Sequence, residues 1–179
     1  KVADGGYVLC GTSGTNPSPP DENDDIWVVR MDDDGDIIWS RIYGEEGVCD
    51  WGLSVIETDF NEFIIGGTNN GDIAALLIDS DGEEIWYNSY MQGDCRALIE
   101  LKAGSYVLAG GWTNSRANMV CIDHNGNELW SETYGDPIGF FQGLRETNDG
   151  IVAAGFITSG RSIFVVKTDF NGEVIRSAV

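Results

Sequence analysis

Basic residues are scarce in this chain: ten Lys and Arg stand against 30 Asp and Glu, which gives a formal net charge of −20. Nucleic acids and anionic membranes are bound through basic patches, so the composition argues against both kinds of partner. No apolar run is long enough to cross a membrane, and we expect no membrane insertion. The composition favours solubility, and cations or basic molecules as partners.

Cysteine is limited to four residues, and no C-x-x-C pair occurs among them. This spacing argues against a zinc site. Cys10 lies in an apolar stretch, which predicts a small core residue. Cys49 and Cys95 occupy comparable positions of successive repeats, so a disulfide between them is an open alternative, and the pairing state of Cys121 is equally open.

Helix-period patterns are few, whereas 24 glycines and 42% hydrophobic residues are present. These features predict an all-β protein, and 179 residues suffice for one domain with a sizeable core. The sequence begins at Lys1 with neither an initiator Met nor a signal-like segment. We therefore expect a processed or excised chain.

One eight-residue pattern, Asp-x-x-Gly followed by a short alternation that ends in Trp or Arg, occurs four times. The copies are residues 32–39, 79–86, 123–130 and 169–176, and their leading aspartates are 47, 44 and 46 residues apart. The Asp can bond its own following backbone and the Gly supplies a positive φ, as tight turns require. Because an apolar run precedes each copy, the pattern predicts a hairpin between two strands.

Three of the four copies carry a Tyr four residues after the Trp. The pairs are Trp39 with Tyr43, Trp86 with Tyr90, and Trp130 with Tyr134. An even spacing puts both rings on one face of a strand. We expect them to pack between neighbouring sheets.

Each repeat contains a second strand that is apolar on both faces and is closed by a glycine. These stretches are Tyr7–Cys10, Phe63–Ile65, Tyr106–Ala109 and Ile151–Ala154, followed by Gly11, Gly66, Gly110 and Gly155. Such runs predict strands buried between sheets, with close backbone approach at the glycines.

Four-stranded units of about 45 residues that pack face to face describe a β-propeller. We predict one β-propeller domain over 1–179, with blades at approximately 1–44, 45–91, 92–135 and 136–179. A two-sheet sandwich is the structural rival, but it would not require the same side chain at the same place in every repeat.

The motifs resemble repeats of secreted and cell-surface bacterial and archaeal β-propeller proteins, and the Gly-x-x-x-Trp part is similar to the tryptophan-docking repeat of quinoprotein-like propellers. The matching segments in the first repeat are Asp4–Gly11, Asp25–Arg30, Asp32–Trp39 and Tyr43-Gly44. The resemblance implies a scaffold or interaction role outside the cytoplasm. It does not imply pyrroloquinoline quinone, because the basic, metal-binding pocket for that cofactor has no counterpart.

Both ends of the chain depart from the pattern. Lys1 aligns with Glu57, so the first blade lacks the strand equivalent to 54–57, and Arg176 replaces the docking Trp in the last copy. Open sheet edges attract strands from other chains. Either the chain is a piece of a longer propeller protein, or another subunit fills the gap and the chains assemble.

Calcium is the one ion that the turns suggest, because oxygen-bearing side chains alternate in every copy. The most acidic copy, with Asp32, Asp34 and Asp36, is the best candidate. However, Gly comes fourth rather than sixth in the pattern and no bidentate Glu follows at position twelve. Turn chemistry explains the same residues, so we nominate no metal ligand.

No catalytic or cofactor-binding residue stands out. His124 is the only histidine, and its counterparts in the other turns are Asp33, Ser80 and Phe170, which predicts an exposed side chain without a catalytic role. With 30 acids, paired carboxylates for glycoside hydrolysis are an open alternative, but three glutamates recur at the end of the first strand of the three complete repeats, which favours an architectural role for them. They are Glu57, Glu100 and Glu146.

One enlarged loop, Thr12–Asp25, replaces a connection of about five residues and holds three of the four prolines. A stiff, solvated excursion and a contact loop for a partner are equally compatible with it.

From the sequence we expect a non-catalytic extracellular or cell-surface module that serves structure or interaction and assembles with itself through the incomplete blade. The alternative is a ligand- or carbohydrate-binding propeller, or a fragment of a larger propeller enzyme, that uses acids around a central channel.

Overall fold

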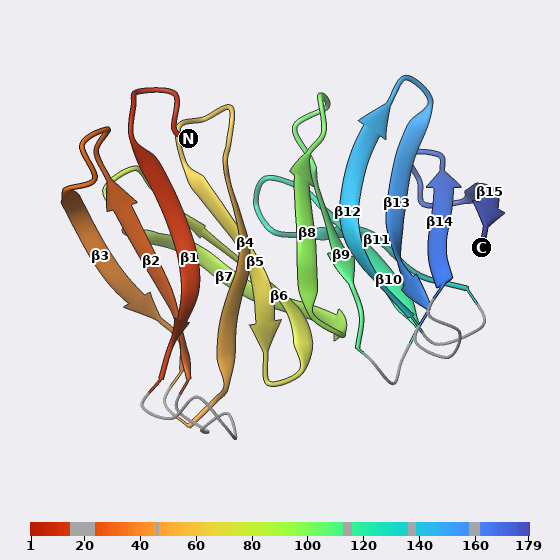
Figure 1. Ribbon diagram of the computed structural model, residues 1–179, viewed down its shortest axis with the longest axis horizontal. Coiled ribbons are helices and arrows are strands. Elements are labelled where there is room, and N and C mark those ends of the chain that lie inside the picture. The colour runs from red at the N-terminus through yellow and green to blue at the C-terminus, as the bar shows by residue number, and fades with distance from the viewer. Residues whose placement is uncertain (15–23, 46, 113–115, 136–138, 158–161) are drawn as a thin grey trace.

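Turn-forming and strand-forming segments alternate along the chain, and a computed structural model shows how they combine (Figure 1). The structure describes all residues except 15–23, 46, 113–115, 136–138 and 158–161. Every regular element in the described ranges is a β-strand, and the strands form four antiparallel sheets. Among these residues, no helix is long and apolar enough to cross a bilayer.

The first sheet has three strands, and each of the other three has four. The first sheet contains β1 (Tyr7–Ser13), β2 (Asp25–Met31) and β3 (Ile37–Tyr43). The second contains β4 (Asp50–Glu57), β5 (Phe63–Asn69), β6 (Asp72–Ile78) and β7 (Glu84–Gln92). The third contains β8 (Cys95–Glu100), β9 (Tyr106–Gly110), β10 (Ala117–Ile122) and β11 (Glu128–Tyr134). The fourth contains β12 (Gly139–Thr147), β13 (Gly150–Ile157), β14 (Ser162–Thr168) and β15 (Val174–Ala178).

The predicted hairpins are confirmed at all four Asp-x-x-Gly turns, which join β2 to β3, β6 to β7, β10 to β11 and β14 to β15. In the second turn, Oδ1 of Asp79 accepts the backbone N–H groups of Asp81 and Glu83 at 2.9 and 2.8 Å. Gly82 has a φ of 80°, which a residue with a Cβ rarely adopts. The other three copies repeat both features.

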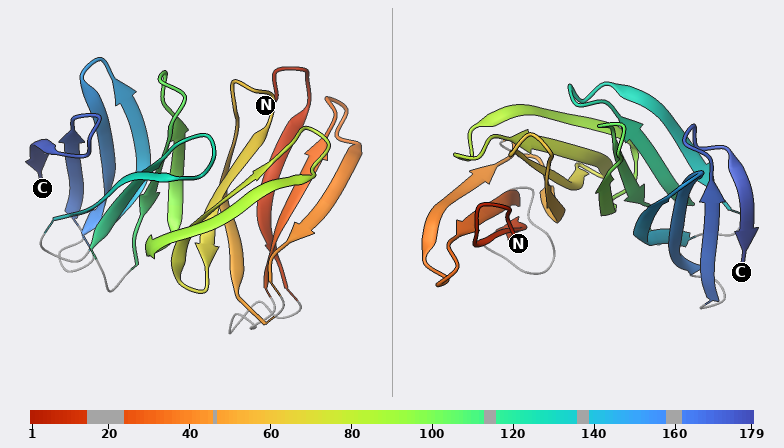
Figure 2. Two further views of the ribbon diagram at one scale, coloured as in Figure 1. Left: turned by 180° about the vertical axis from the view of Figure 1, so that it is seen from behind. Right: turned by 90° about the horizontal axis from the view of Figure 1, so that it is seen from above.

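The four sheets stand side by side along an open arc, with the first and fourth sheets at its two ends (Figure 2). Seen from above, the first strands β4, β8 and β12 line the inner side of the arc, and the last strands β3, β7, β11 and β15 form its outer side. The order within each complete sheet follows the order along the chain. Compared with the complete sheets, the first sheet of the described residues therefore lacks the inner strand, which would lie beside β1.

Three hydrophobic clusters fill the spaces between successive sheets. Ile64 and Leu77 of the second sheet pack against Tyr106, Leu108 and other side chains of the third. Such face-to-face packing buries strands on both sides, and β5 and β9 are buried along nearly their whole length.

The predicted burial of the second strand is wrong in the first repeat. Tyr7 and Leu9 of β1 are 44% and 52% exposed, whereas their counterparts Phe63 and Ile65 in β5 are at most 1% exposed. Burial requires a neighbouring sheet on each face, and this chain places no sheet of described residues in front of the first one (Figure 2).

Candidate functional site

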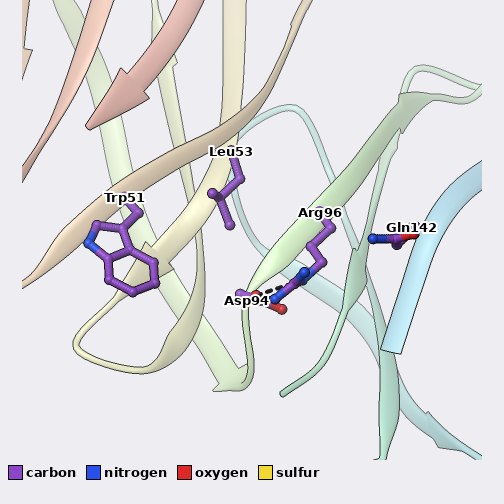
Figure 3. A pocket seen from close by; sticks show the side chains of 5 residues that line it. All are labelled: Trp51, Leu53, Asp94, Arg96 and Gln142. Atoms are coloured by element: carbon purple, nitrogen blue, oxygen red, sulfur yellow. Dashed lines mark hydrogen bonds and ion pairs between the residues drawn. The ribbon is translucent and has the colours of Figure 1, made fainter. Parts of the chain in front are cut away.

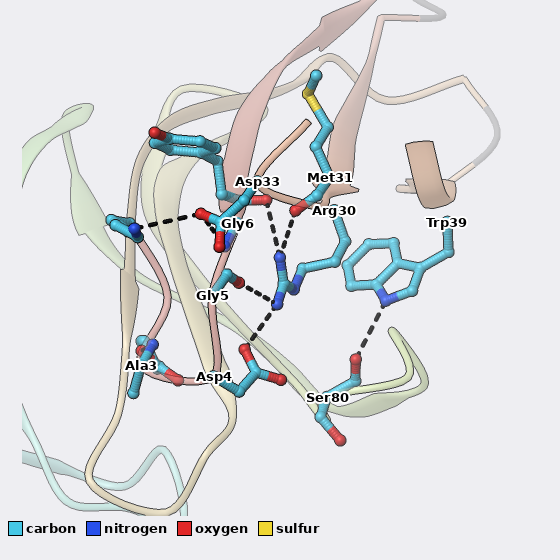
Figure 4. A network of polar contacts seen from close by, with 12 residues as sticks. Ala3, Asp4, Gly5, Gly6, Arg30, Met31, Asp33, Trp39 and Ser80 are labelled. Atoms are coloured by element: carbon cyan, nitrogen blue, oxygen red, sulfur yellow. Dashed lines mark hydrogen bonds and ion pairs between the residues drawn. The ribbon is translucent and has the colours of Figure 1, made fainter. Parts of the chain in front are cut away.

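The tryptophan of each hairpin reaches the turn of the following sheet. The indole nitrogen of Trp39 donates to the carbonyl of Ser80 at 3.1 Å, that of Trp86 to His124 at 3.0 Å, and that of Trp130 to Phe170 at 2.9 Å. The first of these contacts is drawn in Figure 4. The prediction that these rings pack between neighbouring sheets is confirmed.

The paired tyrosine makes a second contact with the same turn. The hydroxyl group of Tyr43 donates to the carbonyl of Gly82 at 2.6 Å, and those of Tyr90 and Tyr134 reach the equivalent carbonyls of Gly126 and Gly172 at 2.9 and 2.8 Å. The turns of the second, third and fourth sheets are therefore each held by one Trp and one Tyr of the preceding sheet.

The recurring glutamates supply a third contact between sheets. Oε2 of Glu57 accepts the backbone N–H of Ala3 at 2.7 Å, Oε2 of Glu100 accepts that of Asp59 at 3.0 Å, and Glu146 accepts that of Lys102 at 3.3 Å. In every case the donor belongs to the preceding repeat. The architectural role expected for these glutamates is confirmed.

The turn of the first sheet has the same shape as the others but receives no such contacts from the residues that the structure describes. Its carbonyls equivalent to those of Ser80 and Gly82 belong to Asp33 and Gly35, and neither accepts a hydrogen bond from the described part of the chain. Gly82 is buried by Arg41 and Tyr43, whereas Gly35 is exposed. We call a turn that accepts the Trp and Tyr contacts a receiving turn. The first sheet has a turn of this kind whose two carbonyls accept no such contact from the described residues.

An apolar pocket of about 560 Å³ lies on the open face next to that turn. Leu9, Trp27, Val29 and Met31 line it, and it extends from Gly11 on β1 to Gly35 in the turn. The corresponding residues of the second sheet, such as Ile65 and Leu76, are fully buried against the first sheet. The pocket is therefore the uncovered equivalent of an internal contact surface.

Gly11 marks the edge where the inner strand is missing. A Cβ on its counterparts Gly67, Gly110 and Gly155 would meet a backbone carbonyl of the first strand of their sheet, or of the residue before it, at 1.7, 1.8 and 1.9 Å. A Cβ on Gly11 would meet no described residue within 4 Å. The glycine leaves space for a strand that the described residues do not supply.

The N-terminal residues fold over the end of the first sheet through Arg30 (Figure 4). Its guanidinium donates to Asp4 at 2.7 Å and to the carbonyl of Gly5 at 2.7 Å, and it also contacts the carbonyl of Met31. The Arg30 side chain is only 7% exposed. These contacts fix the segment that leads into β1. They leave open the edge of β1 that faces away from β2, beside which the described residues place no strand.

A second pocket, of about 390 Å³, lies among the first strands of the three complete sheets, which line the inner side of the arc (Figure 2). Figure 3 shows it from close by. Trp51, Leu53, Asp94, Arg96 and Gln142 line it. The Arg96 guanidinium pairs with Asp94 at 2.7 Å and lies 4.5 Å from the ring centre of Phe140. The pocket combines an aromatic surface with fixed polar groups, which sequence reasoning did not single out because the three strands that contribute them are far apart in the chain.

The sequence predicted an exposed side chain for His124, but in the structure this side chain is half-buried. Its ring lies 4.5 Å from that of Phe60, its Nδ1 is 3.0 Å from the Tyr106 hydroxyl, and its Nε2 is 3.6 Å from Oε2 of Glu62. The turn lies against the neighbouring sheet, and sequence periodicity cannot show that approach. The imidazole fills a gap in the contact between the second and third sheets.

The leading aspartates of the turns bind backbone N–H groups with one carboxylate oxygen, as the turn interpretation predicts. In the described ranges, no cluster of three or more His, Cys, Asp or Glu side chains is arranged to hold a metal ion. The calcium alternative for Asp32, Asp34 and Asp36 therefore gains no support from the structure.

The four cysteines, Cys10, Cys49, Cys95 and Cys121, are free thiols, so the disulfide considered between Cys49 and Cys95 is not formed. Burial raises the pKa of the Cys95 thiol to about 12 and that of Cys10 to about 11. Most of the enlarged loop, residues 15–23, lies outside the described part of the chain, and its role as a contact loop stays a prediction.

Comparison with known proteins identifies a shape but no family. No protein-family model matches the chain, and no curated protein matches it. Among solved structures it is similar to one described as a crystal structure of the eukaryotic initiation factor, with a TM-score of 0.51 and 9% sequence identity. The match covers 99% of this chain and 54% of that one, so the chain spans about half the length of the solved chain. At this identity the likeness concerns the fold alone.

Proposed function

We propose that this chain is a β-propeller module in which each sheet is one blade, and that it acts as a non-catalytic structural or interaction protein outside the cytoplasm. Another chain, or another copy of this one, completes the first blade by adding a strand beside β1. The repeated Trp, Tyr and Glu contacts support the blade assignment, because each blade meets the next in the same way. The net charge of −20 suits a solvated surface and disfavours nucleic acid as a partner.

The observation that carries the proposal is the space beside Gly11, which none of the described residues occupies. In the complete sheets, the equivalent glycine admits a carbonyl of the inner strand, and a side chain there would collide with it. Gly11 has no such neighbour among the described residues, yet the same residue type occupies the position. An open edge of this kind is a template for strand addition.

The test is to replace Gly11 by Val and to measure assembly by electron microscopy and light scattering. The side chain fits the open edge of the free chain, so folding is preserved, but it blocks an incoming strand. Gly143→Val is the matched control, because a Cβ there also meets nothing within 4 Å among the described residues and the site lies in another sheet. Loss of assembly in the Gly11 variant alone supports the proposal, and equal behaviour of both variants contradicts it.

A second candidate function, as a ligand- or carbohydrate-binding module or part of a larger enzyme, is favoured by the inner pocket with Trp51, Arg96 and Gln142 (Figure 3). An indole face can stack on the apolar side of a sugar ring while Arg and Gln side chains bond its hydroxyl groups. A glycan-binding screen with and without Ca²⁺ tests this function, with Trp51→Ala as the variant that should abolish binding. No binding in either condition would rule it out.

A further inference from the structure

One row of side chains in each complete sheet points toward the following sheet. In the second and third sheets this row is apolar, and it is buried or half-buried in the cluster that joins its own sheet to the following one. The rows are Ile56, Ile64, Leu77 and Trp86 in the second sheet, and Ile99, Val107, Cys121 and Trp130 in the third. An apolar row therefore indicates that its sheet packs against an apolar face of another sheet.

The equivalent row of the fourth sheet is basic. Strand pairing places Arg145, Val152, Lys167 and Arg176 side by side across β12 to β15. Three of the ten cationic residues of the chain lie in this one row. Lys167 pairs with Asp149 at 2.6 Å, whereas Arg145 and Arg176 are exposed and form no hydrogen bond or ion pair with described residues.

The receiving turn at the other end of the arc is the most acidic of the four. Residues 32–36 contain Asp32, Asp33, Asp34 and Asp36. Asp32 bonds the backbone of its own turn and Asp33 contacts Lys1 and the N–H of Gly6. The carboxylates of Asp34 and Asp36 have no partner in the described part of the chain.

An arginine that packs on such a turn is already present inside the molecule. Arg41 of β3 extends onto the next turn, where its guanidinium pairs with Glu83 at 2.8 Å, and its chain lies against Gly82. Glu83 and Asp36 occupy the same position of their turns. An Arg on an outer strand can therefore pack against an acidic turn of the neighbouring sheet, as Arg41 does within this chain.

The open face beside the acidic turn also suits cationic side chains. Tyr7 and Trp27 expose 44% and 43% of their surface there. Guanidinium groups bind aromatic faces, as Arg96 does on Phe140 at 4.5 Å, and long cationic side chains cover apolar surface with their methylene groups.

We infer that copies of this chain associate head to tail, with the basic row of the fourth sheet packed on the open face of the first sheet of the next copy. Arg176 then takes the place of the docking Trp and lies on the acidic turn 32–36. The partner is a second copy because the two faces complement each other in charge and match the two sides of the repeated contact. This inference rests on the proposed function, since it names the partner of the same open end.

Contacts of this kind are heterologous, and they close into a ring when the copies are related by a suitable rotation. The sheets already follow an arc (Figure 2). A second copy that continues the curvature closes the ring with two identical junctions. The expected assembly is a dimer with twice the 19.5 kDa mass of one chain.

Charge reversal tests the junction without disturbing the fold, because both sites are exposed. Arg176→Glu and Asp34→Arg should each weaken association by about tenfold or more, measured by sedimentation equilibrium. An equimolar mixture of the two variants should recover it, because one junction of the mixed dimer pairs the two introduced side chains and the other pairs the native Arg176 with the native Asp34. Glu132→Arg, at an exposed site on β11 of the third sheet, is the control with the same change in net charge as Asp34→Arg.

Association that weakens in both variants and recovers in the mixture supports the junction. A chain that stays monomeric, or an assembly that responds to Asp34→Arg no more than to Glu132→Arg, overturns it. Assembly that is lost in Gly11→Val but is indifferent to Arg176→Glu would retain the proposed strand addition and reject this partner face.

Discussion

The indole nitrogen of Trp86 lies 3.0 Å from the carbonyl oxygen of His124, although the two residues belong to different sheets. The same relation joins Trp39 to Ser80 and Trp130 to Phe170. At each of the three contacts between successive sheets, one indole N–H group and one turn carbonyl hold the two sheets at the same spacing. Within the described residues, the relation has no counterpart at the open turn 32–36 or at Arg176.

Replacing Trp86 by Ala should lower the free energy of unfolding by roughly 3–5 kcal/mol, because the ring packs against the second cluster and satisfies a carbonyl. Trp27→Ala is the control, since this ring lies on the open face, and it should cost less than about 1 kcal/mol. Denaturant titration measures both. Equal losses of stability in the two variants would mean that packing of Trp86 between the two sheets does not stabilise the fold.

Gly110→Ala should destabilise the chain far more than Gly11→Ala. The new Cβ at position 110 would lie 1.8 Å from the carbonyl oxygen of Asp94, so the backbone beside β8 must move, at a cost of about 1–3 kcal/mol or more. At position 11 the Cβ meets none of the described residues within 4 Å, and the change should be within about 0.5 kcal/mol. Thermal unfolding of both variants at low concentration, where the chain is unassembled, provides the comparison.

Glu100 should make the protein less stable as the pH rises through the range of its titration. Burial, together with the negative charges of Asp59 and Glu62, raises the pKa of this carboxyl above its ordinary value. The hydrogen bond from the Asp59 N–H lowers the pKa but does not offset this rise. The folded state thus binds a proton more tightly than the unfolded state, and this contribution is lost as the pH rises past the raised pKa.

Glu100→Gln retains the acceptor for the Asp59 N–H and removes the buried charge. The variant should melt at a higher temperature than the native chain at pH 7, and the difference should vanish toward about pH 4, where the unfolded chain's glutamates are also protonated. Glu84→Gln, at an exposed position, makes the same change in net charge and serves as the control. A difference that stays constant with pH would contradict the assigned cause.

The thiols should react slowly in the native protein and completely after unfolding. Burial keeps Cys95 protonated at neutral pH, and only the thiolate is a good nucleophile. A colorimetric thiol assay in denaturant without reductant should count four groups per chain. A count of two would show a disulfide and contradict the free state of Cys49 and Cys95.

Much of this architecture could be predicted from the sequence because its determinants are local. Asp79 and Gly82 specify a turn by their own chemistry, and the four-residue spacing of Trp86 and Tyr90 places both rings on one face. The missing strand follows from alignment of Lys1 with Glu57. These properties depend on residues close together in the chain.

The rest depends on neighbours that periodicity does not reveal. Tyr7 and Phe63 occupy equivalent apolar strands, yet only Phe63 is buried, because only its sheet has another one in front of it. His124 contacts Phe60 and Tyr106 because its turn lies against another sheet. The inner pocket joins Trp51, Arg96 and Gln142 from three different strands, and these residues follow one another at intervals of 45 and 46 positions along the chain.

The most direct test of the open edge is residue-resolved amide hydrogen exchange of β1 at concentrations below and above the onset of assembly. The account predicts that the β1 amides pointing away from β2 exchange quickly in the dilute chain and become protected when another strand adds. Protection of these amides in the dilute monomer, or fast exchange at every concentration at which the protein assembles, would contradict it.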